Sequence, residues 1–164
     1  MELSVSVGEA DSRFSFPEQG KITSDTYRLG FIVDTGYSWQ FFENQTLKLE
    51  LETGVHRWED ALLENNKTGA YLTPMWRYYF ERDKFSPYIA IGVGASYTDD
   101  DEFMDRKLGS RLLFEDRFEV GAVLYDVHRI SLSINHYSNA DLADINHGVN
   151  LYYLNYAYRL KDKK

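Results

Sequence analysis

The 164-residue sequence contains no cysteine, which excludes a disulfide framework and any thiol-based metal site. It also has no run of 18 apolar residues, so a membrane-spanning helix is excluded. No basic run is longer than the tail at residues 161–164, and the net charge of -8 argues against a nucleic-acid partner. No signal peptide begins at Met1. These absences leave open a soluble β-domain and the mature form of a membrane barrel, whose strands alternate and have modest hydropathy.

Aromatic residues are abundant, with 13 Tyr, 10 Phe and 3 Trp, and they favour strands over helices. Several stretches alternate apolar and polar residues with the period of two that is typical of a β-strand. Strands are expected at residues 2–8, 27–34, 47–56, 71–80, 85–97, 111–124, 130–138 and 148–160. Their connections alternate between long and short. The pattern predicts an all-β fold of eight antiparallel strands in a single barrel domain over residues 1–164.

Two arrangements of these strands turn the apolar faces in opposite directions. A soluble sandwich or lipocalin-type barrel buries them, whereas an outer-membrane barrel turns them toward lipid. The polar faces mix glycine with charges of both signs, which can fill a narrow lumen. These charged residues are Arg28, Asp34, Lys48, Glu50, Glu52, Arg111, Glu115, Arg117 and Glu119. Aromatic residues suited to interfacial girdles recur on the apolar faces: Tyr27, Trp76, Tyr78, Phe85, Tyr97, Tyr152, Tyr156 and Tyr158. The pattern favours an up-and-down outer-membrane barrel with an apolar exterior and a polar, filled lumen.

The strand expected at residues 130–138 carries two polar side chains on its apolar face. Ile130, Leu132 and Ile134 define that face, and the period of two continues it to His136 and Ser138. Side chains two residues apart on one strand point the same way, with Cβ atoms roughly 7 Å apart. A base and a nucleophile therefore lie side by side where burial in lipid would penalise them.

Strand pairing brings two further polar residues to this pair. Because the turn before the strand is short, the residue numbers of two paired residues should add up to about 252 to 254. This places Asp116 opposite His136. Across the loop after the strand, the residue numbers of two paired residues should add up to about 286 to 288. This places Asn150 beside His136 or Ser138. Asp116 and Asn150 both belong to the apolar faces of their strands. The sequence thus predicts a four-residue polar cluster on the outer wall.

Such a cluster suits acyl transfer. Ser138 would attack an ester carbonyl, His136 would take its proton, and a carboxylate or amide would hold the imidazole tautomer. Asn139, and Asn146 in the following loop, are candidate donors to the developing oxyanion. The alternative is a rim of polar side chains at the level of the lipid headgroups, hydrogen-bonded only to neighbours.

The remaining histidines form no metal-binding constellation. His56 is expected in the lumen, His128 at the surface of a turn and His147 at the surface of a loop. No metal and no cofactor are therefore expected.

The segment HYSNA at residues 136–140, followed by Asn146-X-Gly148, resembles the outer-membrane lipid A 3-O-deacylase family, the PagL type. The block LGSRLLFEDR at residues 108–117 is similar to the sixth strand of that family. The resemblance spans nearly the whole chain. It implies a barrel in the bacterial outer membrane that hydrolyses the ester-linked acyl chain at position 3 of lipid A. Lipopolysaccharide and outer-membrane lipid are the implied partners of a monomer or homodimer.

The motif match also implies roles for individual residues on the outer wall of the barrel. His136 would be the general base, Ser138 the nucleophile and Asn139 the oxyanion donor. The best-known form of the family carries a glutamate at the position of Asn150. An amide there can hold a histidine tautomer, but it has no charge with which to stabilise an imidazolium; the loss can cost on the order of 10⁴ in rate. Asp116 is expected to supply the missing carboxylate.

Three functions remain open from the residues alone. The first is a serine esterase acting on lipid A, and the second is a catalytically silent lipid-binding or structural barrel. The third is a soluble barrel that binds a small apolar ligand. The direction in which the apolar faces point separates the third from the other two.

Overall fold

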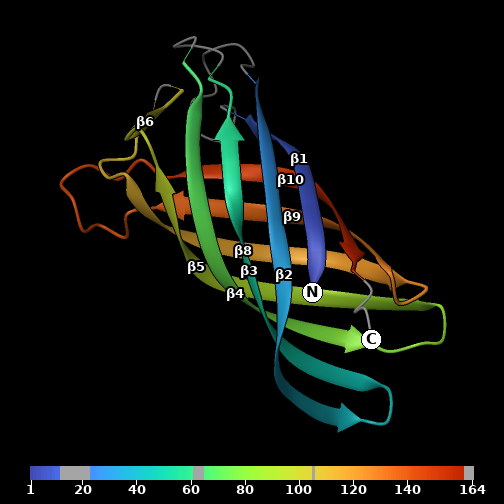
Figure 1. The fold of residues 1–164 in the computed structure, drawn as a ribbon. Coiled ribbons are helices and arrows are strands. Elements are labelled where there is room, and N and C mark those ends of the chain that lie inside the picture. Colours follow the sequence, from blue (N-terminus) through green and yellow to red (C-terminus); the bar gives the residue numbers. More distant parts are fainter. Residues whose placement is uncertain (12–22, 61–64, 105, 161–164) are drawn as a thin grey trace.

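The computed structural model describes residues 1–11, 23–60, 65–104 and 106–160, which form a closed antiparallel barrel (Figure 1). The barrel strands are β1 (Glu2–Asp11), β2 (Thr23–Phe42), β3 (Gln45–Trp58), β4 (Lys67–Phe80), β5 (Phe85–Thr98), β8 (Leu112–Leu124), β9 (His128–Ser138) and β10 (Val149–Arg159). Each strand pairs with its neighbours along the chain, and β1 pairs with β10 to close the barrel. The expected eight-stranded fold is confirmed. Within the described ranges, no helix is long and apolar enough to cross a membrane.

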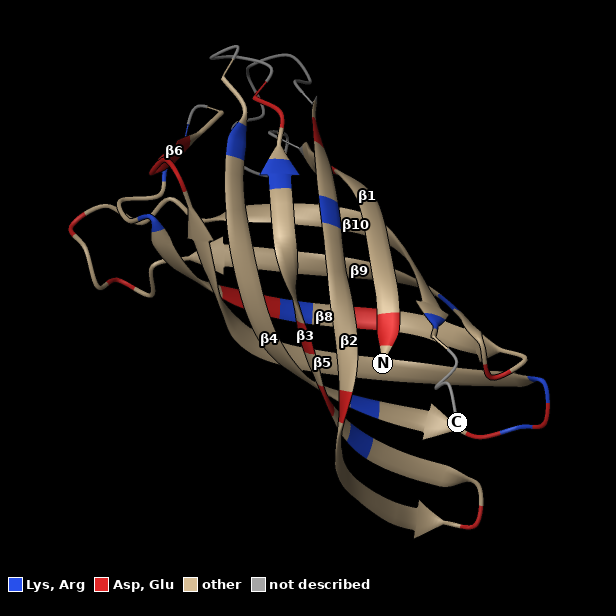
Figure 2. Cartoon of the chain, in the orientation of Figure 1, with Lys and Arg blue, Asp and Glu red and all other residues tan. Residues whose placement is uncertain are grey.

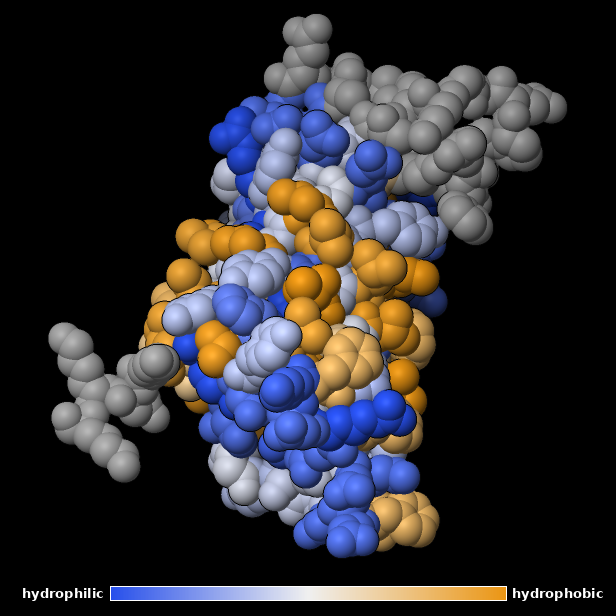
Figure 3. All heavy atoms as spheres, turned by 90° about the vertical axis from the view of Figure 1, so that its right-hand side faces the viewer, coloured by the Kyte–Doolittle hydropathy of each residue, from blue (hydrophilic) through white to orange (hydrophobic). Residues whose placement is uncertain are grey.

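The apolar faces of the strands point outward. Leu132 on β9 and Ile91 on β5 are 60% and 62% exposed, whereas the alternating Ser131 and Ala90 are buried. Figure 3 shows hydrophobic side chains gathered across the middle of one face, with hydrophilic regions above and below them. An exterior of this kind matches the apolar band of an outer-membrane barrel rather than the surface of a soluble one.

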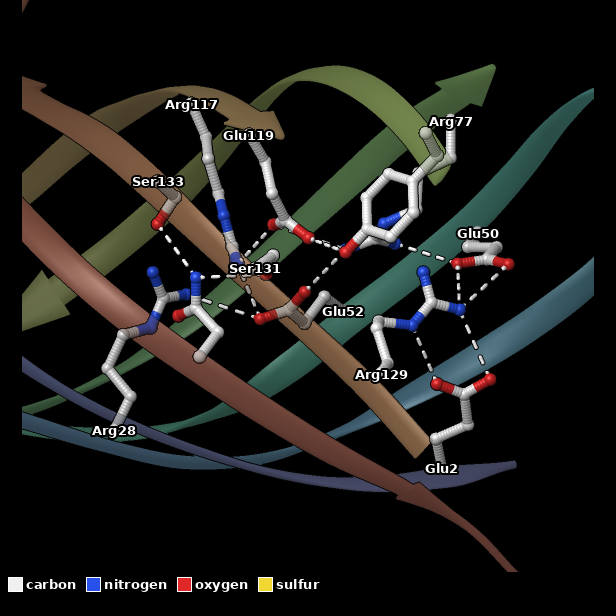
Figure 4. Close-up of polar contacts among 12 residues, drawn as sticks. Glu2, Arg28, Glu50, Glu52, Arg77, Arg117, Glu119, Arg129, Ser131 and Ser133 are labelled. Atoms are coloured by element: carbon white, nitrogen blue, oxygen red, sulfur yellow. Dashed lines mark hydrogen bonds and ion pairs between the residues drawn. The ribbon is translucent and has the colours of Figure 1, made fainter. Parts of the chain in front are cut away.

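The lumen is filled with ion pairs (Figure 4). Glu52 accepts hydrogen bonds from Arg77 at 3.0 Å and from Arg117 at 2.6 Å, and all three side chains are buried. Nearer the end of the barrel where the two chain termini lie, Arg129 donates a hydrogen bond to Glu2 at 2.8 Å. Figure 2 shows positive and negative residues within the barrel strands as well as in the connections. Because these buried charges face opposite charges, part of their desolvation penalty is offset.

Three charged residues expected in the lumen do not lie inside it. Asp34 and Arg111 are exposed, and Lys48 is partly exposed and pairs with Glu81 at 3.7 Å. Asp34 lies where the pairing of β2 with β3 is interrupted by a register shift, and Arg111 precedes the first residue of β8. These residues follow the alternation of apolar and polar side chains, but that alternation continues past the ends of the lumen.

The connections differ from the expectation at three places. The strand expected at residues 27–34 continues to Phe42, so only residues 43 and 44 separate it from β3. The strands expected at residues 2–8 and 27–34 are longer and lie closer together along the chain, because β1 continues to Asp11 and β2 begins at Thr23; residues 12–22 lie outside the described residues. The acidic connection after β5 contains a two-stranded sheet, β6 (Glu102–Phe103) and β7 (Arg106–Lys107), that the alternation did not predict. Two-residue strands are too short to show a period.

Candidate active site

The register of β8, β9 and β10 brings the predicted cluster together. Asp116 on β8 pairs with His136 on β9, and Asn150 on β10 pairs with His136 from the other side. Ser138 pairs with Phe114, at the end of β9 next to the long loop. The predicted pairing is confirmed, and the four polar side chains lie on three adjacent strands of the outer wall.

One hydrogen bond defines the state of the imidazole. His136 Nδ1 lies 2.7 Å from Asn150 Oδ1, and both side chains are half-buried. A carbonyl oxygen can only accept, so the proton belongs on Nδ1 and Nε2 keeps its lone pair. Nε2 is then the nitrogen available to a nearby hydroxyl.

The other two members of the cluster make fewer contacts. Ser138 is half-buried and Asp116 is exposed. Among the described residues, no hydrogen bond joins His136 to Ser138 or to Asp116. Catalytic hydrogen bonds are often long in free enzymes and shorten when substrate binds. The arrangement is a base with a fixed tautomer, beside a hydroxyl and an exposed carboxylate.

Tyr137 holds the active strand from inside the barrel. Its side chain points opposite to those of His136 and Ser138 and is fully buried. Its ring meets that of Trp58 edge-on with centroids 5.0 Å apart, and Trp58 packs against Phe103 at 5.1 Å. This apolar core fills the loop end of the lumen directly behind the polar pair.

The two amides expected as oxyanion donors are both engaged in the loop after β9. Asn139 Nδ2 donates to Leu108 O at 2.8 Å and to Ile145 O at 2.7 Å. The backbone N–H of Asn139 donates to Asn146 Oδ1 at 3.0 Å, and Asn146 Nδ2 donates to Asp141 Oδ1 at 2.9 Å. Asn139 is buried and Asp141 is exposed, so the Asn146 amide is the easier one to release.

The same loop begins with a strained turn. Ala140 and Asp141 have φ values of 53° and 60°, and Leu142 N donates to Asn139 O at 3.1 Å across them. Left-handed conformations of residues other than glycine cost roughly 1–3 kcal/mol each and gather at functional sites. The turn immediately follows Ser138 and Asn139.

An apolar groove of about 780 Å³ runs along the outer wall beside the cluster. Its lining includes Phe118, Leu132, Ile134, Tyr152 and Leu154, from β8, β9 and β10. Ile134 is the residue before His136 on the same face of β9. The apolar lining of the groove suits an alkyl chain, and Ile134 brings the groove within two residues of His136 along β9.

Sequence reasoning missed one residue near His136, namely Arg106. Arg106, on β7, binds the carbonyl oxygens of His147 and Gly148, next to His136. No spacing in the sequence links residue 106 to this site; the glycine in Asn146-X-Gly148 was the available signal. The described residues contain no group of three or more His, Asp or Glu side chains that could hold a metal ion.

Together, the outward apolar faces of the barrel and its wall cluster fit the class of outer-membrane ester hydrolases. The family model described as "Lipid A 3-O-deacylase (PagL)" matches residues 25–159, and the chain belongs to this family.

Individual proteins agree with the family assignment. A lipid A deacylase PagL of Pseudomonas aeruginosa is 32% identical over 131 residues, covering 80% of this chain and 76% of the relative. A PagL of Bordetella bronchiseptica is 30% identical over 154 residues, covering 87% of this chain and 85% of that protein. The crystal structure of the outer-membrane enzyme PagL has a TM-score of 0.84 at 29% identity and covers 98% of this chain and 100% of its own. The outer-membrane location of the relative agrees with the outward direction of the apolar faces in this chain.

Proposed function

We propose that this lipid A 3-O-deacylase cleaves its ester by nucleophilic catalysis, with Ser138 as nucleophile and His136 as general base. The observation that carries the proposal is the 2.7 Å bond between His136 Nδ1 and Asn150 Oδ1. It leaves Nε2 unprotonated on the face that Ser138 shares. The nucleophile–base pair and a third residue that orients the base are the parts that acyl transfer requires.

The proposed reaction has two halves. Ser138 Oγ attacks the ester carbonyl carbon while its proton moves to His136 Nε2, and the tetrahedral intermediate collapses to an acyl-serine. The leaving 3-oxygen of the sugar takes the proton from His136. Water then attacks the acyl-serine with the same base, which releases the fatty acid and restores both side chains.

We assign the two tasks of the third triad member to different residues. Asn150 orients the imidazole through its carbonyl but carries no charge. Asp116, paired with His136 on the adjacent strand, offers a carboxylate to the imidazolium that forms during the reaction. Orientation from β10 and charge from β8 together replace a single carboxylate.

Asn146 is the proposed oxyanion donor. Its Nδ2 bonds an exposed carboxylate, that of Asp141, which water can solvate when the amide turns to substrate. Asn139 Nδ2 bonds two backbone carbonyls, one of them buried with it, and releasing it leaves these acceptors unpaired at about 1–3 kcal/mol each. We therefore assign Asn139 mainly to holding the loop.

The position of the site suits lipopolysaccharide in the outer leaflet. Long loops of outer-membrane barrels face the cell exterior, and Ser138 lies where β9 enters such a loop. The groove beside Ile134 supplies an apolar channel for the acyl chain. All proposed catalytic residues come from one chain, so a monomer suffices, and a homodimer is compatible if β8–β10 stay open to lipid.

The test is incubation of the refolded barrel with lipid A in detergent, followed by mass spectrometry. Loss of one 3-hydroxyacyl chain from position 3 is expected, with the free fatty acid as second product. An intact barrel that hydrolyses neither lipid A nor a simple ester would instead indicate a silent lipid-binding barrel. Cross-linking in outer membranes separates the monomer from the homodimer.

A further inference from the structure

Gly148 lies against the edge of the His136 ring. It is buried, has φ +51° and immediately precedes β10. A Cβ atom at this position would lie 2.9 Å from His136 Cε1 and 3.3 Å from Nε2. Both the left-handed backbone and the close approach require glycine. The backbone at residue 148 therefore bounds the side of the imidazole that carries the reactive nitrogen.

Arg106 holds this backbone in place. Its Nη1 donates to Gly148 O at 2.5 Å and to His147 O at 3.0 Å. The backbone of Lys107 adds two bonds to His147: His147 N donates to Lys107 O at 3.2 Å, and Lys107 N donates to His147 Nδ1 at 3.3 Å. The β6–β7 hairpin is thus bound to the last residues of the loop between β9 and β10.

The hairpin is anchored in the barrel as well as in the loop. Phe103 and Leu108, on its two sides, are fully buried in the core that contains Trp58 and Tyr137. Leu108 O also accepts a hydrogen bond from Asn139 Nδ2 at 2.8 Å. Figure 1 shows β6 at the same end of the barrel as this loop. Arg106 consequently extends from a hairpin that is held in place on both sides.

We propose that Arg106 and Gly148 are positioning residues for His136, an inference that rests on the role proposed for His136 as base. Arg106 fixes the Gly148 carbonyl, Gly148 limits the Cε1–Nε2 edge of the ring, and Asn150 binds the adjacent Nδ1. These contacts hold the ring in one orientation. A neutral amide holds a histidine less strongly than a carboxylate, because charge-assisted hydrogen bonds are roughly twice as strong. Packing against Gly148 supplies the missing restraint.

The first test separates orientation from substrate binding. Gly148→Ala and Arg106→Ala are each expected to lower kcat about 100-fold, the cost of displacing a reacting group by about 1 Å. KM should change less than twofold, because neither residue lines the alkyl groove. Arg106→Lys should be intermediate, and methylguanidinium should partly restore Arg106→Ala. Unchanged kcat in both alanine variants overturns the proposal.

Gly36 provides the matched control for Gly148. It also has a positive φ, +83°, but an added Cβ would meet nothing within 4 Å. Gly36→Ala therefore carries backbone strain without crowding a ring, and kcat should remain unchanged. Heat-modifiable migration in gel electrophoresis confirms that each variant is a folded barrel. An equal loss of kcat in Gly36→Ala and Gly148→Ala would show a general folding effect and overturn the positioning role.

A second readout does not depend on activity. Barrels labelled with ¹⁵N in the imidazole rings are compared by NMR in micelles, with His136→Ala assigning the relevant signals. Gly148→Ala and Arg106→Ala should shift or broaden the His136 signals and leave those of His56 in the lumen unchanged. This result with an inactive wild type would refute the proposed function and retain the positioning role. Unchanged His136 signals with an active wild type would refute the positioning role alone.

Discussion

The barrel has two polar regions where a simple inside–outside rule expects none, and they are built differently. In the lumen, Arg77 contacts the carboxylates of Glu50, Glu52 and Glu119 at 2.8, 3.0 and 3.6 Å (Figure 4). On the outer wall, among the described residues, one side-chain hydrogen bond joins two members of the cluster, His136 and Asn150. The lumen contains many charges with close partners, whereas the wall contains few polar groups with unused capacity.

The difference separates structural polarity from reactive polarity. A buried charge with close partners is out of reach of a substrate, and changing it mainly changes folding. A hydroxyl and an imidazole that share a face without bonding each other remain available to a substrate. The number of polar residues is therefore a poorer guide to function than their accessibility to a substrate.

The largest expected effect is at the wall. Ser138→Ala and His136→Ala should each reduce lipid A deacylation by roughly 10³-fold or more, because the nucleophile and base act as a unit. Mass spectrometry of lipid A measures the loss. Ser133→Ala, on the same strand but facing the lumen, is the control and should keep its activity. Activity retained in both wall variants would remove the contrast between the two regions.

A change in the lumen should affect stability instead. Arg77→Met leaves buried carboxylates without their partner and should lower the free energy of unfolding by about 3–5 kcal/mol. Urea unfolding in micelles, followed by tryptophan fluorescence, measures it. Arg57→Met is the control, because Arg57 pairs with Glu59 at 3.4 Å on the exposed surface, and it should change little. A larger loss in the control than in Arg77→Met would contradict the distinction.

The division of tasks between Asp116 and Asn150 predicts a smaller effect. Asp116→Asn should lower kcat about tenfold, as expected for one exposed charge near an imidazolium. Asn150→Glu places a carboxylate on Nδ1 directly and should raise kcat a few-fold at most. Steady-state kinetics on lipid A provides both values. If Asp116→Asn has no effect while Asn150→Glu strongly accelerates the reaction, Asp116 is not the source of charge.

The smallest effect concerns acid stability of the connection that carries β6. A hydrogen bond from Lys67 at 2.6 Å lowers the pKa of the Asp100 carboxyl below its ordinary value of 3.8. Although partial burial opposes it, hydrogen bonding by Thr68 similarly lowers the pKa of Asp99.

Because both pKa values are lower in the folded state, their stabilisation is complete above about pH 3.8 and is lost as the pH falls through the folded values. Amide hydrogen exchange in residues 99–104 should therefore rise below pH 3.8 and stay constant, after correction for intrinsic rates, between pH 5 and 8. Asp100→Asn should exchange faster at pH 6. Exchange in this variant that matches wild type at pH 6 would show that the ion pair does not hold the connection.

Strand register was predictable at the active site because it depends on local quantities. The two-residue period determines which face each side chain occupies, and the turn before β9 is short enough to leave one pairing. That placed Asp116, His136 and Asn150 on adjacent strands, as the structure shows. The same period failed for Asp34 and Arg111, because alternation alone does not say where a lumen ends.

The hydrogen bonds of the irregular connections were not predictable in this way. Asn139 was expected to donate to substrate, yet its amide binds the carbonyls of Leu108 and Ile145. Arg106 was not expected near His136 at all. Both contacts join two loops whose paths follow no period, and their backbone groups find partners only when the barrel brings the loops together.

From residue types and spacing alone, the chain encodes strand faces, pairing and the positions of a base and a nucleophile. These properties are periodic, and each depends on a few neighbouring residues. The tertiary structure decided which nitrogen of His136 is free, which amide is occupied and what limits the ring. Those outcomes depend on contacts of about 3 Å between segments up to 42 residues apart, such as Arg106 and Gly148, and only the closed barrel brings such segments together.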